Sequence, residues 1–122
     1  MHSSNPPLRT LAASLIAVLV TLALPATAMT IREMRTLEKL EKQGGTYLDY
    51  YLVGVMEGAL EAHNDAVRKG ATPTICVNGR RLLPSMAKDL FTTELQHSAG
   101  LYEADMPVEL VMLQALRTVY AC

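Results

Sequence analysis

Apolar residues recur at helical spacing in four stretches of the chain after residue 28. The four predicted helices are Thr30–Gln43, Tyr47–Lys69, one that starts near Pro84, and one that follows Asp105 and runs toward Cys122. Thr74–Val77 is the competing strand, and it is too short to build a sheet. The pattern therefore predicts an all-α fold, a small bundle of about four helices.

Local signals mark where these helices begin and end. Thr30 and Glu33 have the spacing of a capping box, in which each side chain satisfies the other residue's free backbone N–H. We expect Gly44-Gly45 to end the first helix. Pro84 suits the first turn of the third helix, and Asp105 is expected to cap the fourth.

The second predicted helix has a face that is almost free of side-chain bulk. Gly54, Gly58, Ala62 and Ala66 fall four residues apart and so lie along one side of the helix. Each glycine costs up to about 1 kcal/mol relative to alanine in a helix interior. We therefore expect another helix to pack closely on Gly54, Gly58 and Ala62, either within this domain or across a homodimer. The charge of Glu57 beside them argues against a pair of membrane helices.

Residues 1–28 have the layout of a secretory signal peptide. Arg9 precedes the apolar run Leu11–Leu24, and Ala26-Thr27-Ala28 is a small-x-small cleavage site. The run of about 14 residues is shorter than the roughly 20 that a membrane-spanning helix needs. We expect cleavage after Ala28, which leaves a single helical domain, residues 29–122, with no membrane span.

The charge of this domain narrows the choice of partners. Arg9 is the one basic residue of 1–28, so ten of the eleven Lys and Arg remain against twelve Asp and Glu, a net charge of −2. Such a balance argues against nucleic acid as the main partner and against a polybasic membrane surface. A domain of 94 residues also has a modest core, which a covalent cross-link would stabilise.

Cys76 and Cys122 are predicted to form that cross-link. Two cysteines in an exported chain typically close into one disulfide. The bond would join the loop before the third helix to the end of the fourth, and chain-entropy arguments give it on the order of 4 kcal/mol. The alternative is a nucleophilic thiol, which needs a nearby base. A cysteine at the chain end is poorly placed for such a site.

No pattern of catalytic or metal-binding residues stands out. His63 and His97 have no zinc-ligand spacing, so we expect polar residues near helix ends, no metal and no cofactor. Glu57, Glu61 and Asp65 repeat every four residues and predict an acidic, solvated or partner-facing stripe rather than a general acid/base pair. The sequence has no Ser-His-Asp signature, phosphate loop or dinucleotide motif. An enzyme is therefore not supported.

A few polar and aromatic positions are candidate contacts for a protein partner. Asn78 and Gly79 form a turn signal. Arg80 and Arg81 follow at the tip of the loop, where recognition residues are common. Tyr50 lies off the apolar face of the second helix, and an exposed tyrosine is a good interface anchor. An ordinary surface loop and an incidental surface tyrosine are the alternatives.

Three segments together resemble the type VI secretion amidase immunity proteins. They are Tyr51-Leu52-Val53-Gly54-Val55, Ile75-Cys76-Val77-Asn78-Gly79 and Ala115-Leu116-Arg117-Thr118-Val119-Tyr120-Ala121-Cys122. In that family a Gly-Tyr-x-x-Gly-Val helix start is followed by Phe-Cys-x-Pro-x-Gly and by the ending Ala-Leu-x-x-Ala-Phe-Pro-Cys. Here Tyr50 replaces the family's glycine, Asn78 stands where proline is usual, and Tyr120-Ala121 replaces Phe-Pro.

The resemblance implies a periplasmic, mostly helical and often dimeric protein. Members bind a peptidoglycan-cleaving amidase toxin and block its cleft with a protruding loop or helix end, without chemistry of their own. On this chain the inserting segment would be Val77–Leu83, anchored at its base by Cys76, which lowers the entropy cost of binding. Its donors would be Asn78, Gly79, Arg80 and Arg81.

Two other functions fit the same sequence. A small helical chaperone of acid stress in the periplasm would need a dimer that opens as its twelve carboxylates lose charge. An accessory subunit of an envelope assembly would use the face of Gly54 and Gly58 as its docking seam.

Overall fold

The computed structural model describes residues 28–40 and 44–122, so nearly all of the predicted signal peptide lies outside the described residues. The described chain forms four α-helices, a short 3-10 helix and no strand. They are α2 (Ile31–Leu40), α3 (Gly44–Arg68), α4 (Met86–His97), η1 (Ala99–Leu101) and α5 (Val108–Val119). The all-α prediction is confirmed for this part of the chain.

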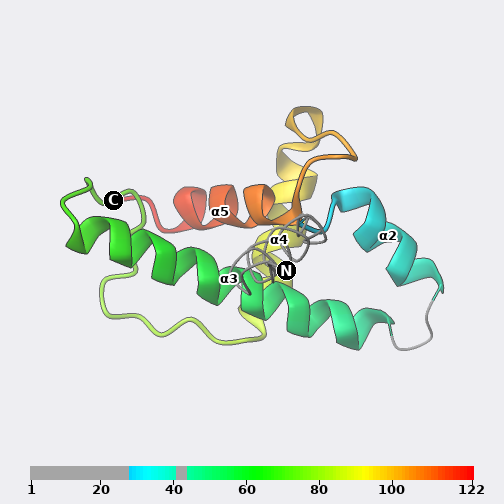
Figure 1. Cartoon of the computed structure of the whole chain (residues 1–122), viewed down its shortest axis with the longest axis horizontal. Helices are drawn as coiled ribbons and strands as arrows, with labels where there is room; N and C mark the ends of the chain where they lie inside the picture. Colours follow the sequence, from blue (N-terminus) through cyan, green and yellow to red (C-terminus); the bar gives the residue numbers. More distant parts are fainter. Residues whose placement is uncertain (1–27, 41–43) are drawn as a thin grey trace, which may run out of the picture.

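The long helix α3 is the scaffold on which the other helices pack. Figure 1 shows α5 lying alongside α3, with α4 crossing behind both and α2 beside the amino-terminal half of α3. The loop between α3 and α4 runs back along α3 before α4 begins. This path brings the loop next to the carboxyl end of α5.

The predicted capping box at the start of α2 is confirmed. The Thr30 backbone N–H donates to Glu33 Oε2 at 2.7 Å, and the Glu33 N–H donates to Thr30 Oγ1 at 3.2 Å. The bond from the Thr30 N–H lowers the pKa of the Glu33 carboxyl. The contribution of this cap to stability is therefore present at neutral pH and is lost as the pH falls through the carboxyl's titration.

Two predicted helix ends are wrong. Gly44 and Gly45 form the first turn of α3 and do not lie in a linker after the first helix. Asp105 does not cap α5: Pro107 is the N-cap residue, and no side chain caps it. The backbone just before α2 takes this place, since the Val108 N–H donates to Met29 O at 2.9 Å. A tertiary contact thus satisfies a free N–H that a local cap would otherwise bind.

The core is formed by apolar side chains from all four helices and Ile75. Its most deeply buried large side chains are Ile31, Met56, Phe91, Val108, Val111, Met112 and Leu116. Leu40 and Val119 are 76% and 54% exposed, and each is the last residue of its helix.

The face of small residues on α3 is open. Gly54, Gly58, Ala62 and Ala66 are all exposed. A Cβ built on Gly54 or Gly58 would meet nothing within 4 Å. No helix of the described domain packs on this face, because α4 and α5 pack on the buried side of α3. The expected close packing of another helix on this face does not occur within the domain. Packing across two copies of the chain stays a prediction.

We predict that Gly58→Ala stabilises the domain. The new methyl group has free space, and alanine costs about 0.5–1 kcal/mol less free energy than glycine in a helix interior. Gly70→Ala is the contrasting variant, because φ at Gly70 is +103°, and alanine there is strained and should destabilise. Chemical unfolding of dilute protein measures both changes. A loss of stability in the Gly58 variant would contradict an open face.

Candidate functional site

The loop between α3 and α4 reverses at Asn78-Gly79, as predicted. Both residues have positive φ, 54° and 74°, and the Arg80 N–H donates to Val77 O at 3.1 Å. Two left-handed central residues closed by this bond define a type I′ turn, and Asn-Gly is the dipeptide that adopts it most readily. The backbone at the tip is therefore fixed by its own sequence.

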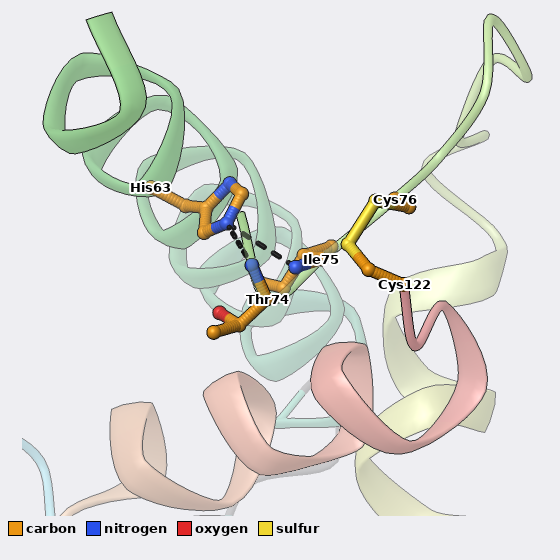
Figure 2. The surroundings of a disulfide bond; sticks show 5 residues. All are labelled: His63, Thr74, Ile75, Cys76 and Cys122. Atoms are coloured by element: carbon orange, nitrogen blue, oxygen red, sulfur yellow. Dashed lines mark hydrogen bonds between the residues drawn. A yellow bond between two sulfur atoms is a disulfide. The ribbon is translucent and has the colours of Figure 1, made fainter. Parts of the chain in front are cut away.

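A disulfide holds the base of this turn. Cys76 and Cys122 are bonded, with their Cα atoms 4.9 Å apart, so the predicted cross-link is present and neither sulfur is a free thiol. The Cys76 N–H donates to Tyr120 O at 2.7 Å, and Ile75 forms an antiparallel bridge with Ala121. The end of the chain thus lies along the start of the loop (Figure 2).

Arg80 clamps the turn onto the same chain end. Its guanidinium carbon lies 5.1 Å from the centre of the Tyr120 ring, within the range of a cation–π contact. Its Nε also donates to Val77 O at 2.9 Å. Arg81 is exposed and makes no hydrogen bond or ion pair with the residues that the structure describes. The two arginines, predicted as equivalent donors, therefore differ: Arg80 holds the turn and Arg81 faces solvent.

The loop combines a packed base with an exposed tip. Val77 and Leu82 are half-buried and pack against the core. Asn78, Gly79 and Arg81 are exposed, and so is Leu83, at 50%. The tip offers polar donors next to an apolar side chain on a backbone that is already ordered. Such a segment can enter the cleft of another protein at a low cost in conformational entropy.

His63 has a structural role that the sequence reasoning missed. Its Nε2 accepts hydrogen bonds from the backbone N–H groups of Thr74 at 3.0 Å and Ile75 at 3.2 Å (Figure 2). It is therefore not one of the loosely solvated polar residues that were expected. No local pattern reveals this contact, because the loop must first turn back along α3. His97, in contrast, is exposed at the end of α4.

Tyr50 does not join the loop tip. It is 76% exposed and lines a groove of about 810 Å³ between α3, α5 and residues 71–74. The open small-residue face forms the floor of this groove, and residues 77–83 do not line it. The residues predicted to contact a partner protein thus lie on two separate surfaces, the loop and the groove.

Two half-buried phenols join separate parts of the fold. Tyr51 Oη donates to Glu109 Oε1 between α3 and α5, and Tyr102 Oη donates to Glu94 Oε1 at 2.7 Å. Burial, followed by the bond to the carboxylate, raises the pKa of each tyrosine to about 12. The neutral phenols therefore stabilise the fold at physiological pH, and this contribution is lost only as the pH rises above the ordinary tyrosine range.

The acidic side chains of α3 lie on the surface. Glu61 pairs with Arg68 at 2.7 Å and Asp65 with Lys69 at 2.6 Å, and all four are well exposed, so each pair adds little stability. Across residues 28–40 and 44–122, no three His, Cys, Asp or Glu side chains gather as metal ligands would. None of the helices in that part of the chain has both the length and the apolar content to cross a bilayer.

Comparison with protein-family models, with curated proteins and with solved structures found no match to this chain.

We predict that removing the disulfide lowers the free energy of unfolding by about 4 kcal/mol, because it closes a span of 46 residues. The measurement is urea unfolding of the oxidised protein and of the double variant Cys76→Ser/Cys122→Ser. A reductant should lower the free energy of unfolding of the wild-type protein to that of the double variant, and it should leave the value of the double variant unchanged. Equal stability of the two oxidised samples would contradict the account.

Proposed function

We propose that this protein is an exported inhibitor that neutralises a peptidoglycan amidase toxin of type VI secretion. In this proposal residues 77–83 enter the cleft of the toxin, and the protein carries out no reaction of its own and needs no cofactor. The anchored type I′ turn at Asn78-Gly79 is the observation that carries the proposal, because an inhibitory loop must present its donors without first being ordered.

Export to the periplasm is part of the proposal. The signal-like segment 1–28 supports it, and so does the disulfide, because such bonds persist in oxidising compartments and are rare in the cytosol. In the periplasm the inhibitor would meet a toxin that acts on the cell wall. Amino-terminal sequencing of protein from the envelope should begin at Met29, after cleavage at Ala28.

Arg81 is the proposed anchor in the complex, and Arg80 the residue that holds the turn. Arginine is enriched among residues that dominate binding energy. Arg81 can donate several hydrogen bonds without giving up a contact in its own protein. Arg80 would have to leave the Tyr120 ring to do the same.

We predict that Arg81→Ala weakens inhibition of the proposed target, a peptidoglycan amidase toxin, by roughly tenfold or more, the size expected for such an anchor. The free energy of unfolding of this variant should be unchanged. Arg80→Ala should weaken inhibition too, but it should in addition lower the free energy of unfolding by about 0.5–1 kcal/mol. Lys39→Ala on α2 is the matched control, an exposed positive charge removed far from the loop in sequence. Inhibition of cell-wall hydrolysis measures the effect, and full potency of the Arg81 variant would reject its role.

We propose further that a second copy of the chain covers the groove of Gly54, Gly58 and Ala62. The free space over the glycines allows two helix backbones to approach closely, and Tyr50 at the same groove supplies an aromatic contact. The loop lies on a different surface, so a dimer could still present both of its inhibitory turns.

We predict that Gly58→Leu converts a dimer to a monomer without unfolding it, because the side chain enters free space in one copy and collides with the other. Light scattering across a dilution series measures the mass. Gly70 lies outside the groove floor, so a variant there should leave the mass unchanged. A wild-type protein that stays monomeric at all concentrations would contradict the proposed dimer.

A further inference from the structure

The bonds of His63 fix its protonation state. A ring nitrogen that accepts two N–H donors carries no proton of its own. Nε2 of His63 accepts from the backbone N–H groups of both Thr74 and Ile75, so the proton of the neutral ring is on Nδ1. Nδ1 is buried and has no hydrogen-bond partner among the described residues. The ring is thus held in one tautomer by its contacts with the loop.

We propose that His63 is a pH-sensitive latch for the segment that leads into the disulfide. Protonation of the ring places a proton on Nε2, which then faces two N–H donors and has no acceptor. Both bonds to Thr74 and Ile75 must break, and residues 71–75 separate from α3. The two bonds therefore require the neutral ring and are lost when the ring is protonated. Imidazoles titrate in the range of about pH 5 to 8.

The charged side chains that line the same groove as His63 come from α5. They are Glu109 and Arg117, which carry opposite charges. Residues 71–75 contribute no titratable side chain. On α3 itself, Glu61 and Asp65 are engaged with basic residues at the end of the helix. The two backbone N–H donors thus remain the groups in direct contact with Nε2.

Opening of the latch would stay local because the carboxyl end of the segment is held. Cys76 remains bonded to Cys122, and its N–H remains bonded to Tyr120 O. Ile75 is 5% exposed and packs in the core, so it resists the opening and exposes apolar surface if it moves. The base of the loop 77–83 would then be held by these two bonds of Cys76, without the bonds of His63 to Thr74 and Ile75. This consequence for toxin binding rests on the proposed function, but the latch itself does not.

NMR of protein purified from the envelope, with its disulfide intact, tests the latch. At about pH 7.5 the ¹⁵N shift of His63 should report an unprotonated Nε2. The amides of Thr74 and Ile75 should shift together with the His63 ring as the pH falls. Their protection from hydrogen exchange should drop by about tenfold at pH near 5, as expected for a local opening.

Three variants make this test specific. His63→Gln retains an acceptor for both N–H groups and does not titrate, so protection should stay high at both pH values. His63→Ala should leave the two amides unprotected at both. His97→Gln removes an exposed histidine and should behave as wild type. An Nε2 that is protonated at neutral pH, or protection that is constant in wild type or falls equally in the glutamine variant, would overturn the latch.

The toxin then connects the latch to the proposed function. Inhibition by wild type should weaken about tenfold on acidification relative to the His63→Gln variant. The NMR result requires no toxin, so failure to bind an amidase would reject the proposed function and leave the latch standing. Intact inhibition with a flat titration of the Thr74 and Ile75 amides would reject the latch alone.

Discussion

The disulfide between Cys76 and Cys122 is the constraint around which the loop of residues 77–83 is organised. It fixes Cys76, at the base of this loop, beside Cys122. The neighbouring backbone bond to Tyr120 and the bridge between Ile75 and Ala121 extend this contact to both sides. The ring of Tyr120 is then in place for Arg80 to stack on it. These contacts hold the base of a loop of otherwise ordinary composition.

The same arrangement separates two surfaces, the loop tip and the groove. The loop tip carries exposed polar residues, whereas the groove over Gly54 and Gly58 is concave and mostly apolar. His63 lies at the groove and holds the segment that leads to the loop. Events in the groove and at the loop can therefore affect each other through one side chain. We regard this connection as the feature of the fold most relevant to regulation.

Local signals in the sequence predicted most of the helical fold and part of the site. The four helices follow from apolar spacing, the cap of α2 from Thr30 and Glu33, and the turn from Asn78-Gly79. Each of these depends on residues close together in the chain. The disulfide was predictable for a different reason: a chain with a signal-like leader and two cysteines leaves a single pairing.

Contacts between distant segments could not be predicted in this way. Met29 replaces Asp105 in satisfying the start of α5. The bonds of His63 and the stacking of Arg80 exist only because the loop returns along α3 to meet the end of the chain. The open face at Gly58 was also unpredictable. The four-residue spacing of small residues indicates a helix face without bulky side chains, but it does not indicate which element packs on that face.

The most direct test of the account is a calorimetric titration of the proposed partner, a peptidoglycan amidase toxin, with two forms of this protein. One is the oxidised wild type, and the other is Cys76→Ser/Cys122→Ser under conditions where both are folded. If the cross-link prepares the loop for binding, the oxidised protein binds at least about tenfold more tightly, with a smaller entropy cost. Equal affinity and equal entropy would contradict the central claim that an anchored loop is the binding element.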